Sequence, residues 1–174
     1  DRAVKADEKY YVSFMGSDFV EEGKKAANWL IENEEKLGLK DKEVIKIVEL
    51  QGTVGSAPAN DRKTGFSEII GKNTKYKITQ SQTGDFTRAK GKEVMESFLK
   101  TDKDIDVLFA HNDDMAIGAI QAIEEAGLKP GVDIKIVSID AVKGAFEAMI
   151  AGKLNCTVEC SPLLGPQLMQ AVKD

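Results

Sequence analysis

The stretch Val107-Leu108-Phe109-Ala110-His111-Asn112-Asp113-Asp114-Met115-Ala116-Ile117-Gly118 decides the fold class. Its first four residues form a short apolar run, which is typical of a strand buried on both faces of a parallel sheet. The residues after the polar cluster show apolar positions at helical spacing, namely Ala116, Ile117, Ile120 and Ile123. Asn112 and Asp113 are favourable N-cap residues. The stretch therefore predicts a strand, a turn and a helix in direct succession.

The same order of strand and helix recurs on either side of this stretch. Further strands are predicted at residues 10–14, 44–50, 76–80, 134–140 and 154–160. Further helices are predicted at residues 18–37, 59–71, 143–150, after 84–87 and from 161 onward. Because the unit repeats about every 25 to 30 residues, we predict an α/β fold with a doubly wound, mostly parallel, Rossmann-like sheet flanked by helices.

Composition and charge narrow the class of protein. The 174 residues are enough for one domain with a substantial core, and 42% apolar with 30% charged residues is typical of a folded globular protein. The net charge is −5, with basic residues scattered among acidic ones, so nucleic acid is not expected as a partner. The sequence has neither an initiator Met nor a signal peptide, and we expect that any targeting segment has been removed.

The sequence offers little that catalysis or metal binding would use. His111 is the only histidine, and we interpret it as a packed or partly exposed residue at a strand end. Cys156 and Cys160 lie four residues apart in a predicted strand, so their Cα atoms should be about 13 Å apart, which is beyond disulfide reach. We therefore predict two free, half-buried thiols, and no metal, cofactor or enzymatic activity.

The stretch Gly52-Thr53-Val54-Gly55 follows a predicted strand and partly resembles a dinucleotide-binding loop. The third glycine of that motif is missing, so a tight turn between strand and helix explains the stretch better.

Hydrogen-bonding and aromatic residues lie at the carboxyl ends of several predicted strands or in the loops that follow them. These residues are Asn60, Phe86, Asn112, Asp140 and Glu159. The carboxyl ends of parallel strands meet at one edge of the sheet, where ligands bind in open α/β folds. Carboxylates and amides can hold hydroxyl groups, and an aromatic ring can pack against C–H groups. The set predicts a site for a neutral polyol or a sugar.

These blocks resemble the C-terminal lobe of type I periplasmic sugar-binding proteins, which are the receptors of ABC transporters. The resemblance runs almost end to end and is greater to the galactofuranose-binding members than to the ribose-binding ones. The matching blocks are Asp1-Arg2, Gly16-Ser17-Asp18, Val48 to Gly52, Asp61 to Phe66, Gly84 to Gly91, His111 to Ile120 and Ser138-Ile139-Asp140. The block that begins at Asn112 is also similar to that of sugar-responsive repressors.

The resemblance implies roles for individual residues. Asp1 and Arg2 would be the hinge pair that bonds sugar hydroxyls. Phe86 would pack on the sugar ring, while Asn112 and Asp140 would bond hydroxyls from this lobe.

Two departures argue against ribose itself as the ligand. The ribose-binding proteins have an arginine ligand where this sequence has Asn60, and a glutamine where it has Cys160. We expect Glu159 to belong to the chemistry that replaces them.

The resemblance also implies a domain organisation and a function. Residues 1–9 would be a hinge segment, residues 10–160 the C-terminal sugar-binding lobe, and residues 161–174 the start of a crossover helix toward an N-terminal lobe. The protein would close two lobes around a monosaccharide such as galactofuranose or ribose, deliver it to the membrane permease of an ABC transporter, and act as a monomer. It would be periplasmic, or lipid-anchored outside the cytoplasm.

The sequence leaves two other classes of function open. The first is the effector-binding core of a LacI-like transcription repressor, which would be preceded by a helix-turn-helix. The second is a sugar-modifying α/β enzyme, for which the sequence shows no general base.

Overall fold

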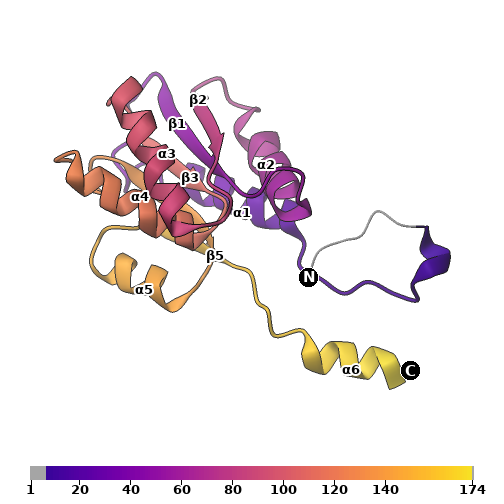
Figure 1. The fold of residues 1–174 in the computed structure, drawn as a ribbon. Coiled ribbons are helices and arrows are strands. Elements are labelled where there is room, and N and C mark those ends of the chain that lie inside the picture. The colour runs from indigo at the N-terminus through magenta and orange to yellow at the C-terminus, as the bar shows by residue number, and fades with distance from the viewer. Residues whose placement is uncertain (1–6, 174) are drawn as a thin grey trace.

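A five-stranded sheet forms the centre of the computed structural model, which describes residues 7–173 (Figure 1). The strands are β1 (Ile45–Gln51), β2 (Tyr76–Thr83), β3 (Val107–Ala110), β4 (Lys135–Asp140) and β5 (Cys156–Glu159). Their order across the sheet is β2-β1-β3-β4-β5, and all neighbouring pairs are parallel. The predicted doubly wound α/β fold is confirmed.

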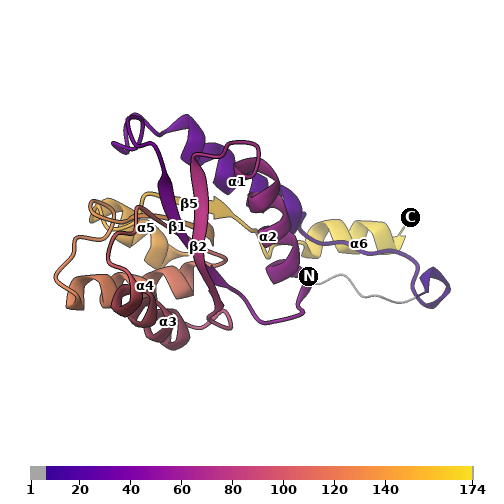
Figure 2. The same cartoon turned by 90° about the horizontal axis from the view of Figure 1, so that it is seen from above.

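Helices cover both faces of the sheet, as the view from above shows (Figure 2). One face packs against α1 (Phe19–Glu32) and α2 (Ala57–Ile70). The other packs against α3 (Arg88–Thr101), α4 (Asp113–Glu125) and α5 (Lys143–Ile150). A short 3-10 helix (Glu8–Tyr10) and α6 (Gly165–Lys173) lie away from the sheet at the two ends of the chain.

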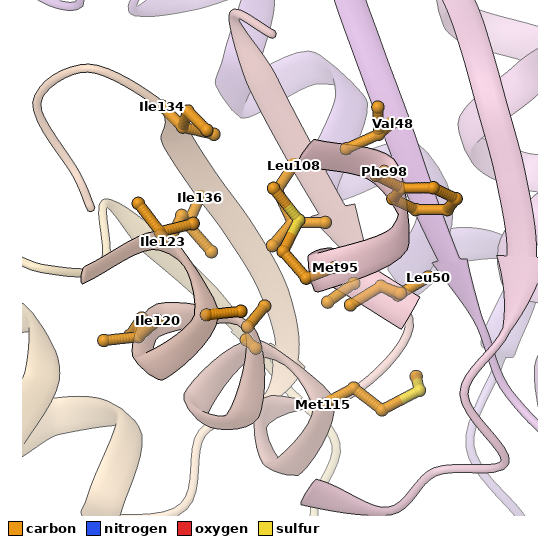
Figure 3. Packing of buried hydrophobic residues seen from close by; sticks show 14 of the residues in the cluster. Val48, Leu50, Met95, Phe98, Leu108, Met115, Ile120, Ile123, Ile134 and Ile136 are labelled. Atoms are coloured by element: carbon orange, nitrogen blue, oxygen red, sulfur yellow. The ribbon is translucent and has the colours of Figure 1, made fainter. Parts of the chain in front are cut away.

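Alternation along the strands divides the core into two apolar layers. Figure 3 shows the layer on the α3/α4 face, where Val48, Leu50 and Leu108 of the strands meet Met95 and Phe98 of α3. The opposite layer includes Phe66 of α2, whose ring stacks on Phe109 of β3 at a centroid distance of 3.8 Å. Each large apolar side chain buried in this way contributes about 1.5 to 3 kcal/mol.

The two helix pairs on opposite faces cross at glycines. A Cβ atom at Gly65 of α2 would lie 1.9 Å from the Val20 carbonyl oxygen of α1. A Cβ atom at Gly118 of α4 would lie 2.0 Å from the Arg88 carbonyl oxygen of α3. Because no side chain fits at these positions, the backbones of each helix pair come into direct contact.

The structure corrects two local predictions and confirms a third. The strand predicted at residues 10–14 is wrong: its hydrogen bonds would need a neighbouring strand, and the segment reaches neither edge of the sheet. The helix predicted at residues 18–37 ends at Glu32, where Asn33 forms its C-cap. Cys156 and Cys160 are free thiols, as predicted. No helix within residues 7–173 has the length and apolarity that a membrane crossing requires.

Candidate functional site

The strand order directs attention to the carboxyl ends of β1 and β3. The connection after β1 leads to α2 on one face, and that after β3 leads to α4 on the other. Such a switch point leaves a crevice in which α/β proteins bind ligands. A hollow of 170 Å³ lies at this end of the sheet, and its lining residues are Phe19, Pro58, Arg62, Phe86, Asn112, Asp140 and Cys160.

Two of the lining residues lie in strained backbone. Phe86 has φ +60° and follows Asp85 at φ +52°, while Asp140 has φ +127° and precedes Ala141 at φ +61°. These are the four residues other than glycine with positive φ in the part of the chain that the structure describes. Such conformations are unfavourable for L-residues and persist where the surrounding structure enforces them, most often at functional sites.

Arg62 is the centre of a buried charged cluster beside the hollow. Its side chain is 4% exposed, and its Nε donates to Glu22 Oε2 at 2.9 Å. Its Nη1 donates to the His111 carbonyl at 2.6 Å, and its Nη2 donates to Asp140 Oδ1 at 3.3 Å. The guanidinium also lies over the ring of Phe86 at 6.0 Å. Arg62 therefore connects helix α1, the turn after β3 and the end of β4.

Asp140 combines partial burial with a position between charges of both signs. Burial raises the pKa of Asp140 to about 6; the Arg62 guanidinium opposes this shift, and the carboxylates of Asp113 and Glu22 reinforce it. Within residues 7–173, Asp140 Oδ2 has no hydrogen-bond donor. This carboxylate therefore has an acceptor oxygen available to a ligand in the hollow.

Asn112 and Phe86, two other lining residues, are held against each other. Asn112 is the N-cap of α4, as predicted, and its Oδ1 accepts from the Met115 amide at 3.1 Å. Its Nδ2 donates to the Phe86 carbonyl at 3.2 Å. A Cβ atom at Gly52 would lie 1.9 Å from the Phe86 ring, so the glycine lets the ring pack against the turn after β1.

The structure brings some of the predicted site residues together and separates others. Phe86, Asn112 and Asp140 line one hollow. Asn60 is exposed on α2, and the arginine in the hollow is Arg62, two residues further along.

The remaining predicted residues lie elsewhere. Glu159 is exposed and lines a neighbouring hollow of 490 Å³, which shares Asp140 and Cys160 with the first. Asp1 and Arg2 fall outside the described residues.

Sequence reasoning missed Arg62 and its partner Glu22, although a signal for both exists. Arg62 falls on the same helical stripe as the buried residues Ala59 and Phe66, and Glu22 falls on that of Phe19 and Ala26. A charged residue inside an apolar stripe is buried and paired in most cases, because an unpaired buried charge is strongly unfavourable. Read this way, the two stripes predict an ion pair between the helices.

The chemistry of the hollow suits a neutral ligand with several hydroxyl groups. A carboxylate, a guanidinium, an amide and an aromatic ring converge on it. Within residues 7–173 no group of three or more His, Cys, Asp and Glu side chains is arranged to hold a metal ion.

Comparisons with known proteins show the family to which this chain belongs. The family model described as "Periplasmic binding protein domain" matches residues 1–173. The galactofuranose-binding protein YtfQ of Escherichia coli is 49% identical over 95% of this chain and 52% of its own length. The ribose import binding protein RbsB of Bacillus subtilis is 35% identical over 93% of this chain and 49% of its own. The chain thus spans about half the length of these curated relatives.

A solved structure extends the likeness to three dimensions. A Mycobacterium smegmatis protein in complex with β-D-fucofuranose superposes with a TM-score of 0.92 at 53% identity. The match covers 99% of this chain and 56% of that one.

Proposed function

This chain belongs to the periplasmic binding protein domain family, and from that premise we propose that it is the C-terminal lobe of the sugar-binding component of an ABC transporter. The whole protein would bind a monosaccharide between two lobes outside the cytoplasm and deliver it to a membrane permease. The observation that supports this most is the hollow at the switch point, where Arg62, Phe86, Asn112 and Asp140 converge.

The ligand we propose is a monosaccharide in its furanose form. The hydroxyl groups would donate to Asp140, whose Oδ2 is available, and accept from Arg62, while the Phe86 ring would cover the C–H face of the sugar. Galactofuranose and β-D-fucofuranose are named for two similar proteins, and ribose for a third. The names of the curated relatives favour transport over a repressor.

The two ends of the chain support a second lobe. A hollow of 810 Å³ lies between the Asp140 turn and the segments at residues 15–17 and 160–168. Helix α6 has no buried residue, and Leu168, Met169 and Val172 are each more than half exposed. We propose that residues 1–9 are a hinge, that residues 10–160 form the lobe, and that residues 161–174 begin the crossover to the other lobe, which would cover these apolar side chains.

Calorimetric titration of D-galactose, D-fucose and D-ribose tests the proposal. Three proteins are compared: the full-length protein, its Asp140→Ala variant and the 174-residue chain. We expect micromolar binding of at least one sugar by the first protein. Loss of the charged acceptor should weaken that binding by about 1.5 to 3 kcal/mol, with little change in thermal stability because Asp140 is not part of either apolar core layer.

The 174-residue chain should bind in the millimolar range or not at all. If the two lobes share the interaction equally, about −8 kcal/mol becomes about −4 kcal/mol. Micromolar binding by this chain alone would show that the site needs no second lobe. Absence of binding by the full-length protein to all three sugars would contradict the proposed ligand class.

A further inference from the structure

His111 lies directly behind the hollow, between β3 and the Asn112 cap of α4. Its side chain is fully buried, at 0% exposure. Its backbone amide donates to the Leu50 carbonyl at 2.9 Å, so it continues the pairing of β3 with β1. The sequence places no other histidine in the chain. A buried imidazole at this point needs partners for both ring nitrogens.

One ring nitrogen of His111 accepts a hydrogen bond and the other donates one. The Gly52 amide donates to His111 Nδ1 at 3.3 Å. Since an N–H group can donate only to an unprotonated nitrogen, we assign the proton to Nε2, which lies 3.0 Å from Glu49 Oε1. The imidazole is therefore neutral, and burial lowers the pKa of His111 in agreement with this assignment.

Glu49 gives the imidazole a fixed partner inside the sheet. This carboxylate is 0% exposed in β1 and also accepts from Ser81 and from Gln51 Nε2 at 3.3 Å, with Lys63 Nζ at 3.6 Å. Burial acts to raise the pKa of Glu49, but the donors, His111 first among them, lower it overall. Glu49 does not line the hollow; its contact with the imidazole connects it to His111, whose carbonyl accepts from Arg62 in the lining.

The pocket residues are connected to His111 through its main chain and through Gly52. The His111 carbonyl accepts from Arg62 Nη1 at 2.6 Å. The Gly52 amide donates to the His111 imidazole, and Gly52 also contacts the Phe86 ring directly. Asn112 is the next residue in the chain.

We propose that His111 is the positioning residue of the pocket, because its imidazole and carbonyl together fix the turn under Phe86, the Arg62 guanidinium and the Asn112 cap in one arrangement. The inference rests on the proposed function for its effect on sugar affinity. The arrangement itself is independent of any ligand. Glu49 anchors the imidazole and so belongs to the same device.

Sugar affinity in the full-length protein tests the positioning role. The double variant Glu49→Gln/His111→Leu removes both ring hydrogen bonds without leaving a buried, unpaired carboxylate. It should bind D-galactose, D-fucose or D-ribose at least about tenfold more weakly than the native protein, which corresponds to the loss of one good hydrogen bond. His111→Gln retains one donor and one acceptor and should recover most of the affinity.

Leu108→Ala is the matched control, because Leu108 is buried in β3, the strand that leads to His111, but faces the α3/α4 layer. It should lower thermal stability and leave the affinity within about twofold of native, since Leu108 is not among the residues that line the hollow. If the double variant retains native affinity, or if His111→Gln is no better than the double variant, the positioning role is contradicted. If the native protein binds none of the sugars, the proposed function fails instead.

Nuclear magnetic resonance of the 174-residue chain decides the arrangement without a ligand. Its single histidine allows the two ring nitrogens to be read directly after ¹⁵N labelling. We expect a neutral imidazole with its proton on Nε2. The resonance of the Gly52 amide should shift in the double variant and stay unchanged in Leu108→Ala. A charged imidazole, a proton on Nδ1, or an unmoved Gly52 amide in the double variant would overturn the inference.

Discussion

The two faces of the sheet are built alike at their helix crossings but place their charges differently. On each face two helices cross at close-fitting glycines, Gly65 in one pair and Gly118 in the other. On each face an arginine also pairs with a carboxylate of the partner helix. Arg62 and Glu22 are 4% and 7% exposed, whereas Arg88 and Asp114 are 54% and 50% exposed.

The difference teaches that the distance between two charges does not determine how much an ion pair stabilises the fold. The exposed pair is the shorter one, at 2.6 Å for Arg88 to Asp114 against 2.9 Å for Arg62 to Glu22. Solvent access decides instead, because water screens an exposed pair and is absent around a buried one. The face with the buried pair is also the one whose arginine lines the hollow. The buried ion pair therefore lies on the face whose arginine contributes to the proposed site.

The largest effect that separates the two faces is expected from Arg62→Met. The substitution leaves Glu22 buried without its cation, and such a loss costs about 3 to 5 kcal/mol. Denaturant-induced unfolding of the 174-residue chain measures the change. Helix content should persist in the native baseline, because the apolar layers do not depend on Arg62.

The control for this prediction is the double variant Glu22→Met/Arg62→Met. It replaces both charges with apolar side chains of similar length and should recover most of the lost stability. If Arg62→Met lowered the free energy of unfolding by less than about 1 kcal/mol, the buried pair would be no stronger than an exposed one. The proposed difference between the two faces would then be wrong.

The next effect is a pH dependence that belongs to the face with the buried pair. Burial raises the pKa of Asp140 to about 6, above a value of about 3.9 in the unfolded chain. The folded state therefore favours the protonated carboxyl. The contribution of Asp140 to the free energy of unfolding is complete below about pH 4 and is lost as the pH rises through about 6.

Asp140→Asn isolates this contribution, because the amide does not ionise. The free energy of unfolding of the native chain, minus that of the variant, should fall by about 2 kcal/mol between pH 4 and pH 8, after allowance for the 29% exposure of the side chain. Urea titrations at several pH values give both profiles. Parallel profiles would mean that Asp140 is solvated like an ordinary surface carboxyl.

The fold was largely predictable from the sequence, because its elements depend on local patterns. The apolar run at Val107, the cap at Asn112 and the regular alternation of strands and helices each follow from neighbouring residues alone. The strand predicted at residues 10–14 failed for the converse reason. A strand exists only with a neighbour, and the sequence does not say whether one is within reach.

The candidate site was predictable only in part. Phe86, Asn112 and Asp140 could be placed because each lies at the carboxyl end of a strand or just after it in a parallel sheet. Arg62 lies in the middle of a helix, and its role depends on burial between α1 and the sheet. His111 looked like an ordinary strand-end residue, since its partner Glu49 is 62 positions away in the chain.

The smallest effect is expected from Arg88→Ala on the face with the exposed pair. Arg88 Nη2 donates to Asp114 Oδ1 at 2.6 Å and Nε donates to the same oxygen at 3.2 Å. Ordering two half-exposed side chains offsets much of the attraction, and water screens the rest, so the loss should be no more than about 1 kcal/mol. Unfolding in low and high salt should give the same small difference within about 0.5 kcal/mol. A loss that approached the value for Arg62→Met would mean that short distance, rather than exclusion of water, sets the strength of both pairs.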